Sequence, residues 1–248
     1  MTPPIPTPLV ATRGLSRSFG GLKAVDHVDF AMAPGEIRAL IGPNGAGKTT
    51  FVSLICGRLA PSSGAIAFDG KDIAHLPAHR RVRLGIAYTF QITSVFANLT
   101  AYDNVALAAQ RVHDDHHRRS ARTLRHAVTE ALERTGLTGR GDQIARNLAY
   151  GHQRLLEVAM GLALEPRLLI LDEPTQGLSD GEIENFIALV KEIARQATVL
   201  LIEHNIDVVM RLADRITVLE AGRILAEGTP DTIRANGEVQ RAYLGTAA

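Results

Sequence analysis

The chain has 248 residues, of which 46% are hydrophobic and 21% are charged, a composition typical of a soluble globular protein long enough to bury its own core. Lys and Arg (27) almost balance Asp and Glu (26), and the formal net charge of +1 excludes a strong overall attraction to nucleic acid or anionic lipid. The single cysteine, Cys56, excludes an internal disulfide, and no apolar run approaches the ~20 residues of a membrane-spanning helix. We therefore expect a cytoplasmic protein that needs partners for any role at a membrane.

The N-terminal segment combines a proline-rich leader with strand-like alternation. Residues 1–8 predict a disordered or polyproline leader. Strands are expected at Leu9–Ala11, Gly14–Phe19 and Ala24–Phe30. Gly20 and Gly21 supply a turn between the last two. Phe19 precedes that turn in a chain with only 4% aromatics, and stacking on a nucleotide base and packing as an edge aromatic are about equally favoured.

A phosphate-binding loop is predicted between an apolar strand, Ile37–Ile41, and a helix that begins near Lys48. The loop matches the pattern G-x-x-x-x-G-K-[ST] in full. Its glycines let successive N–H groups face an anion, and the helix N-terminus adds its positive dipole end. Lys48 would reach the β- and γ-phosphates, and the Thr49 hydroxyl would hold Mg²⁺. The nucleotide-binding residues are therefore expected to be Gly42, Pro43, Asn44, Gly45, Ala46, Gly47, Lys48, Thr49 and Thr50. The alternative, a glycine-rich turn with a chance Lys-Thr pair, is disfavoured by the flanking strand and helix.

The middle of the chain offers weaker candidates. Gln91 follows a strand candidate, Gly85–Phe90, and its amide could contact the metal or a catalytic water, although a surface glutamine is the alternative. Residues 101–147 are helical in pattern and rich in Arg and His. His113, His116 and His117 have a spacing that can bind metal. No carboxylate–thiolate set completes such a site, so a solvated helix face explains the run better, and a nucleic-acid patch would need interleaved aromatics.

Two apolar strands in the second half end in polar residues. Leu168–Leu171 predicts a parallel strand buried on both faces, and Asp172 and Glu173 follow it. Asp172 is expected to order the Mg²⁺ shell, and Glu173 to polarise a water for attack on the γ-phosphate. The alternative is that both acids cap the next helix. Val199–Ile202 is a similar strand, after which His204 could contact the γ-phosphate and help place the water.

A third motif, Asn147-Leu148-Ala149-Tyr150-Gly151-His152-Gln153, precedes a helix with apolar residues at helical spacing. It predicts a second helix N-terminus fit for an anion. Together with the loop at Gly42–Thr49, Asp172-Glu173, Gly177-Leu178-Ser179-Asp180 and His204, it makes the chain resemble an ATP-binding-cassette ATPase over nearly its whole length after the leader.

The resemblance implies roles beyond those read from the residues. Phe19 would be the adenine-stacking aromatic, and Gln91 would lie in the loop that communicates with a membrane partner. Leu148–Gln153 would be the signature motif of a dimer in which two cassettes enclose two ATP molecules, so that Ala149, Tyr150, Gly151 and Gln153 contact the partner's nucleotide. Gly177–Asp180 would line the dimer interface. ATP and Mg²⁺ are the implied cofactors.

The finer resemblance is to the ATPase subunits of branched-chain amino acid importers, because of the signature Asn-Leu-Ala-Tyr-Gly and the tail from Glu227 to Gly245. Three features depart from the general family pattern. Ala149-Tyr150 replaces Ser-Gly, which removes a hydroxyl that usually meets the γ-phosphate, whereas Gly151 and the following N–H groups remain. Asn205 follows His204 where Asp is usual, and Thr175–Ser179 is not the commonest interface loop.

The expected fold is an α/β P-loop NTPase with a RecA-like core around a parallel sheet, an antiparallel β-subdomain and an α-helical subdomain. Residues 9–90 and 148–228 would form the core, residues 91–147 the helical subdomain and residues 229–248 a tail. The expected function is ATP hydrolysis that powers an importer of branched-chain or related amino acids. The expected partners are two membrane permeases, a second ATPase subunit and, indirectly, a solute-binding protein, with the chain held at the inner face of the membrane.

Three alternatives stay open at this stage. The same ATPase role could serve another cargo, such as urea, lipid or another amino acid. A soluble cassette protein could act on nucleic acid or ribosomes, although the chain has one cassette and no long coiled-coil insertion. An ATP-sensing module without useful hydrolysis would account for Ala149 and Tyr150.

Overall fold

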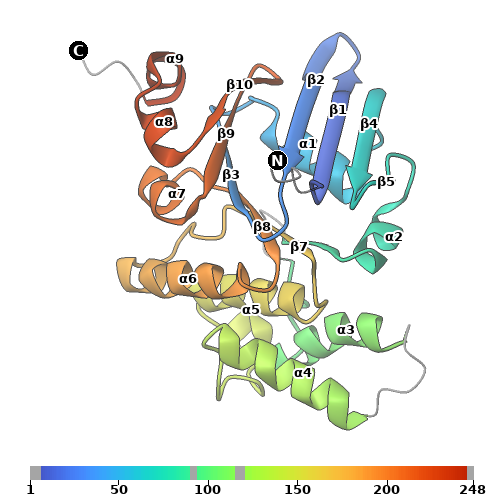
Figure 1. Ribbon diagram of the computed structural model, residues 1–248. Coiled ribbons are helices and arrows are strands. Elements are labelled where there is room, and N and C mark those ends of the chain that lie inside the picture. Colours follow the sequence, from blue (N-terminus) through green and yellow to red (C-terminus); the bar gives the residue numbers. More distant parts are fainter. Residues whose placement is uncertain (1–6, 90–93, 115–120, 245–248) are drawn as a thin grey trace, which may run out of the picture. The chain divides into compact units, whose positions relative to one another are not determined.

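The computed structural model describes residues 7–89, 94–114 and 121–244 (Figure 1). The chain divides into two compact units, one formed by Met1–Arg81 with Thr198–Ala248 and the other by Val82–Ala197. Residues 1–6 of the expected leader and Gln91 lie outside the described residues. The domain boundaries expected from the sequence stay a prediction. Among the described helices, none combines the length and apolar character needed to span a bilayer.

The first unit contains an antiparallel sheet in the strand order β2-β1-β4-β5 (Figure 1). Its strands are β1 (Val10–Phe19), β2 (Leu22–Met32), β4 (Ser63–Phe68) and β5 (Lys71–Asp72). The turn at Gly20 and Gly21 joins β1 and β2 as expected, because Phe19 pairs with Leu22. The two strands expected at Leu9–Ala11 and Gly14–Phe19 are instead one strand, β1. Its register against β2 shifts near Gly14, where a φ of +53° permits the irregularity that the sequence pattern suggested as a break.

The same unit contains parallel strands around the phosphate loop. β3 (Ile37–Ile41) pairs in parallel with β8 (Thr198–Ile202) on one side and with β9 (Arg215–Glu220) on the other, and β10 (Arg223–Gly228) runs antiparallel to β9. Every residue of β3 and β8 is buried, as the unbroken apolar runs predict. Helix α1 (Lys48–Cys56) packs on β2 through an edge-to-face contact between Phe51 and Phe30, whose ring centres are 5.3 Å apart.

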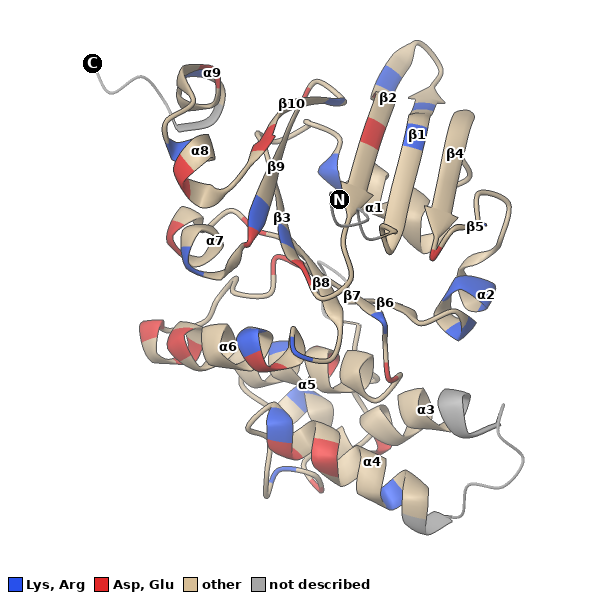
Figure 2. Cartoon of the chain, viewed as in Figure 1, with Lys and Arg blue, Asp and Glu red and all other residues tan. Residues whose placement is uncertain are grey.

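Within the described residues, five further helical segments belong to or border this unit: α2 (Ala78–Arg83), α7 (Ile206–Leu212), α8 (Pro230–Arg234), α9 (Gly237–Val239) and η2 (Gln240–Leu244). α2 carries three arginines and no acidic residue (Figure 2). One of them, Arg81, is 1% exposed and donates hydrogen bonds to four backbone carbonyls, those of Leu54, Ile55, Ala74 and Leu76. Burial lowers the pKa of its guanidinium. Arg81 thus holds the C-terminal turn of α1, where helix carbonyls lack intrahelical partners.

The second unit combines two parallel strands with a helical cluster. Its strands are β6 (Ile86–Tyr88) and β7 (Leu168–Asp172), with Tyr88 paired to Ile170. Its helices are α3 (Ala101–Asp114), α4 (Ala121–Arg134), η1 (Ala145–Asn147), α5 (Tyr150–Leu162) and α6 (Asp180–Ile193). α3, α4 and α5 bury one apolar cluster that includes Val105, Val128 and Leu156. The side chains of His113, His116 and His117 lie outside the described part, so the structure does not bear on their proposed metal-binding spacing.

Candidate functional site

The phosphate loop connects β3 to α1 and has a shape that only glycine allows. Gly42, Gly45 and Gly47 have φ values of +148°, +79° and +102°, a region that side chains with a Cβ rarely occupy. A Cβ on Gly42 would lie 2.1 Å from the carbonyl oxygen of Leu219, and one on Gly47 would lie 2.2 Å from that of Ala24. The loop backbone is therefore enclosed by neighbouring backbone on both sides.

The charges of the loop suit an anion. Lys48 is 7% exposed, and its ammonium donates hydrogen bonds to the carbonyl oxygens of Gly42 (2.6 Å) and Pro43 (3.1 Å). Its charge is thus held over the loop. Helix α1 begins with no side-chain cap and no acidic residue in its first turn, so its N–H groups and dipole favour a bound phosphate. Thr49 is exposed at this helix start.

Phe19 ends β1 with 43% of its surface exposed. The guanidinium carbon of Arg17 lies 4.6 Å from the centre of its ring, which is a cation–π contact. The ring is neither buried nor free on all sides, so its stacking on adenine stays a prediction.

Asp172 and Glu173 lie in the second unit, where β7 ends. Asp172 is 2% exposed, and its carboxylate accepts a hydrogen bond of 2.7 Å from the phenol of Tyr88. Glu173 is half-buried and has a φ of +50°, a left-handed conformation that is uncommon for a residue with a side chain and typical of functional sites. The chain thus turns sharply directly after Asp172. Tyr88 was not identified from the sequence as a partner of Asp172. The only sequence signal for it was an aromatic residue in the strand before Gln91.

The signature motif lies against the loop that was expected to line a dimer interface. Ala149 is the N-cap of α5 and makes no side-chain cap. Tyr150 is 46% exposed, and its ring packs so closely on Gly177 that a Cβ there would lie 2.7 Å from it. A Cβ on Gly151 would lie 2.9 Å from the side chains of both Glu182 and Leu178. Both motifs therefore belong to one continuous surface of the second unit.

A buried ion pair follows the signature motif on α5. Arg154 and Glu157 are 3% and 6% exposed, with 3.1 Å between their nitrogen and oxygen atoms. Arg154 also donates to the phenol oxygen of Tyr150 at 3.1 Å, and Glu157 accepts from the backbone N–H of Ser94. Burial raises the pKa of Glu157, and the Ser94 and Arg154 hydrogen bonds oppose that shift. The pair thus connects the signature motif to Ser94. Gln153 instead donates to the carbonyl oxygen of Leu148 at 3.0 Å.

His204 and Asn205 follow β8 in the first unit. His204 is exposed, and its backbone N–H donates to the carboxylate of Glu203 at 2.9 Å. Asn205 is the N-cap of α7, where its side-chain oxygen accepts from the N–H groups of Asp207 and Val208. Asn and Asp are both good N-cap residues. This explains why Asn can occupy a position at which the ATP-binding-cassette ATPases usually have Asp.

Comparison with known proteins places these features in context. A family model described as ABC transporter matches residues 25–176, and a second, described as branched-chain amino acid ATP-binding cassette transporter, matches residues 223–248. The high-affinity branched-chain amino acid transport ATP-binding protein BraF of Pseudomonas aeruginosa is 39% identical over 252 residues, which cover 97% of this chain and 99% of that protein. LivG of Escherichia coli K12, which has the same description, is 40% identical over 252 residues, which also cover 97% of this chain and 99% of that protein.

A solved structure shows the same fold. The ADP conformation of MJ1267, an ATP-binding cassette of an ABC transporter, superposes with a TM-score of 0.85 at 26% identity and covers 96% of this chain and 99% of that chain. The α/β P-loop NTPase fold expected from the sequence is confirmed.

Proposed function

This chain belongs to the ABC transporter family of ATPases, and from that membership we propose that it is the ATP-hydrolysing subunit of an importer for branched-chain or related amino acids. The cargo is proposed because the relatives named above are about 40% identical over nearly the whole chain and carry that description. The match of residues 223–248 to a model of the same transporter group supports it.

The phosphate loop is the observation that carries the ATPase role. Two of its glycines, Gly42 and Gly47, have no room for a side chain, its lysine donates hydrogen bonds to two loop carbonyls, and α1 begins without a side-chain cap. These features fit a triphosphate, for which the residues of Gly42–Thr50 other than Pro43 would supply N–H donors and Lys48 a positive charge. We propose that Phe19 stacks on the adenine.

The residues also fit Mg²⁺. A buried carboxylate at Asp172 and a hydroxyl at the start of α1, Thr49, are the oxygen ligands that this ion prefers, and Gln91 is a further proposed contact. Bound Mg²⁺ would neutralise charge on the β- and γ-phosphates. We propose that Glu173 accepts the proton of the attacking water and that His204 orients that water. Lys48 would stabilise the negative charge that develops on the phosphate oxygens.

The proposed assembly has two permease subunits and a second ATPase subunit, with a solute-binding protein acting from the other side of the membrane. The chain would thus sit at the inner face of the membrane. The surface formed by Tyr150 and Gly177 would face the partner cassette's nucleotide. ATP would favour the closed dimer because it contacts both cassettes only in that state, and hydrolysis would remove this preference.

Two experiments test the proposal. Purification of the tagged chain from native membranes in mild detergent, with mass spectrometry of the co-purifying chains, should recover two permeases and a second cassette. Recovery of ribosomes or nucleic acid in their place would contradict the transport role and leave the nucleotide site intact. Separately, Lys48→Ala should weaken ATP binding in a direct titration, whereas Lys71→Ala, at an exposed lysine, should not. Equal affinities would contradict the assignment of the loop.

A further inference from the structure

The turn between β9 and β10 touches the phosphate loop through one glycine. Ala221 and Gly222 have φ values of +47° and +79°, the pattern of a tight hairpin turn that favours glycine at its second position. The backbone N–H of Gly222 donates to the carbonyl oxygen of Ala46 at 2.9 Å, and the carbonyl of Gly222 accepts from the N–H of Asp26 at 2.8 Å. Gly222 therefore bridges the phosphate loop and β2.

No side chain separates these three backbones. A Cβ on Gly222 would lie 2.9 Å from the carbonyl oxygen of Ala24 and 3.1 Å from that of Lys23. A Cβ on Gly47 would lie 3.4 Å from the α-carbon of Gly222. Any side chain at Gly222 would have to move the turn, and the turn could not move without releasing Ala46.

Peptide geometry explains what the hydrogen bond to Ala46 achieves. The carbonyl of Ala46 and the N–H of Gly47 belong to one planar trans peptide, in which the two groups point in opposite directions. This hydrogen bond holds the Ala46 carbonyl toward the β9–β10 turn. The Gly47 N–H must then point away from that turn, and in this orientation it would be a donor to an anion bound by the loop.

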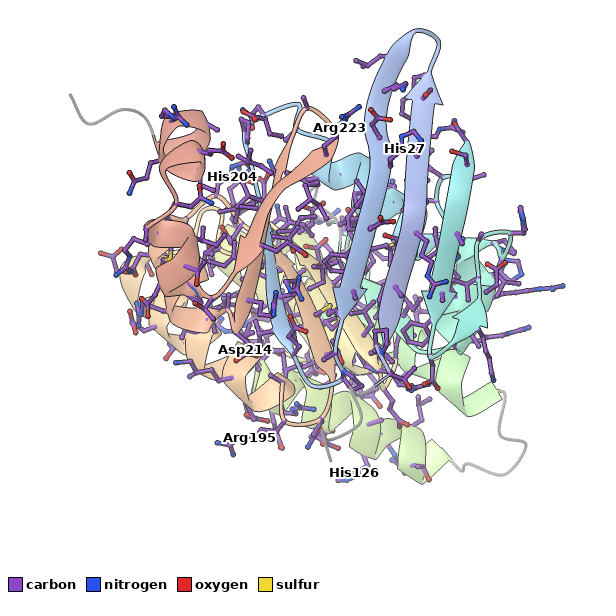
Figure 3. All side chains as sticks on the ribbon, turned by 45° about the horizontal axis from the view of Figure 1, so that its top comes forward. His27, His126, Arg195, His204, Asp214 and Arg223 are labelled. Carbon is purple, nitrogen blue, oxygen red and sulfur yellow. The ribbon has the colours of Figure 1, made fainter. Side chains whose placement is uncertain are left out.

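An ionic contact holds the turn against β2. The carboxylate of Asp26, which is 6% exposed, accepts two hydrogen bonds from Arg223, from Nε at 2.9 Å and from Nη2 at 2.6 Å. Lys23 and His27 also contact this carboxylate. Figure 3 shows Arg223 beside the hairpin turn and His27 on the neighbouring strand β2. Because the Arg223 side chain is 70% exposed, water screens the pair, so its contribution to the stability of the fold is modest and its main effect is to orient the turn.

We infer that Gly222 is a positioning residue for nucleotide binding, which acts through the Ala46 carbonyl to orient the Gly47 N–H, and that Arg223 holds Gly222 in place. The inference rests on the proposed function only in taking the loop at Gly42–Thr49 as the phosphate site. It adds the β9–β10 turn to the elements that shape the phosphate loop.

The chain contains a matched control. Asp69 and Gly70 form the turn between β4 and β5, with φ values of +51° and +73°, nearly those of Ala221 and Gly222. A Cβ on Gly70 would meet no atom within 4 Å, in contrast to one on Gly222. Alanine at either position imposes the same unfavourable backbone conformation, but only at Gly222 does it push on the neighbours of the phosphate loop.

The experiment measures the Kd for ATP by titration, together with thermal stability, in the wild type, Gly222→Ala, Gly70→Ala and Lys48→Ala. We expect Gly222→Ala to bind ATP about tenfold more weakly than Gly70→Ala, which corresponds to the loss of one well-oriented donor to a charged ligand. Gly70→Ala should lose thermal stability and keep its affinity. Equal affinity of the two alanine variants would overturn the inference.

A second pair of variants leaves the backbone unchanged and decides the question if Gly222→Ala does not fold. Arg223→Ala should weaken ATP binding about threefold, whereas Arg215→Ala, at an exposed arginine of the same hairpin, should not. Equal affinity of these two variants would overturn the role of Arg223. If Gly222→Ala also does not fold, the same result would overturn the whole inference. A wild type that does not bind ATP, or that binds it as Lys48→Ala does, would instead refute the phosphate site itself.

Discussion

The phenol of Tyr88 donates a hydrogen bond to the carboxylate of Asp172, with 2.7 Å between the two oxygens. Tyr88 reaches Asp172 because β6 and β7 run in parallel and Tyr88 pairs with Ile170, two residues before Asp172. The contact orients a buried carboxylate that we propose as a ligand of Mg²⁺. Groups that orient a ligating carboxylate affect metal affinity even though they do not touch the metal.

We expect Tyr88→Phe to lower the apparent affinity for Mg²⁺ in ATP hydrolysis about tenfold, because Asp172 loses the donor that fixes its orientation. The measurement is a Mg²⁺ titration of ATPase activity at saturating ATP. Tyr102→Phe, on α3 in the same unit, is the control. An unchanged Mg²⁺ requirement in Tyr88→Phe would count against Asp172 as a metal ligand.

Glu173→Gln should keep ATP binding and lose about a hundredfold or more in turnover, because an amide cannot accept the proton of the attacking water. Glu165→Gln is a matched control, since Glu165 has a φ of +48° against +50° for Glu173. The measurement is steady-state ATPase activity with the partner cassette present. Wild-type turnover in Glu173→Gln would rule out this residue as the base.

Arg81→Ala should reduce the free energy of unfolding by about 3 kcal/mol, because it removes the donor for four backbone carbonyls, two in the last turn of α1 (Leu54 and Ile55) and two before α2 (Ala74 and Leu76). Arg80→Ala changes an exposed neighbour on the same helix and should have little effect. Urea unfolding followed by circular dichroism would measure both. A small loss in Arg81→Ala would mean that water replaces the guanidinium.

Acid should weaken the contact between the β9–β10 turn and β2. The guanidinium of Arg223, followed by His27, holds the pKa of the Asp26 carboxyl well below its usual range. The folded protein therefore binds fewer protons at this site than the unfolded chain, so the stabilisation is present above about pH 4 and is lost as the pH falls further. The melting temperature of the wild type should exceed that of Asp26→Asn at pH 6, and the difference should shrink below about pH 4. A difference that stays constant with pH would exclude this ionic contribution.

The sequence predicted best those features that depend on neighbours along the chain. The phosphate loop and the turn at Gly20 and Gly21 follow from local backbone requirements, and the structure has the turn where it was expected. The break between Leu9–Ala11 and Gly14–Phe19 was wrong because pairing with β2 and β4 carries β1 through Gly14.

Contacts between distant residues were missed. Arg81, Tyr88 and Gly222 act on partners far away in the sequence, and no local pattern distinguishes them. Gly222 and Gly70 illustrate the point, since both occupy similar turns and only the fold brings one of them to the phosphate loop. Arg38 is a further case, because it is buried in an otherwise apolar strand with Glu36 and Glu227 as partners.

The position of β3 between β8 and β9 has a consequence for folding during synthesis on the ribosome. β3 is made early, whereas both of its neighbours follow residue 197. Both edges of the apolar strand β3 therefore remain unpaired while more than half of the chain is synthesised. In this state the strand is prone to associate with other chains. The turn at Gly222 emerges later still. A nascent chain that stops before it would carry the complete phosphate-loop sequence and lack the contact that gives the loop its shape, so nucleotide would be expected to assist only the final stage of folding.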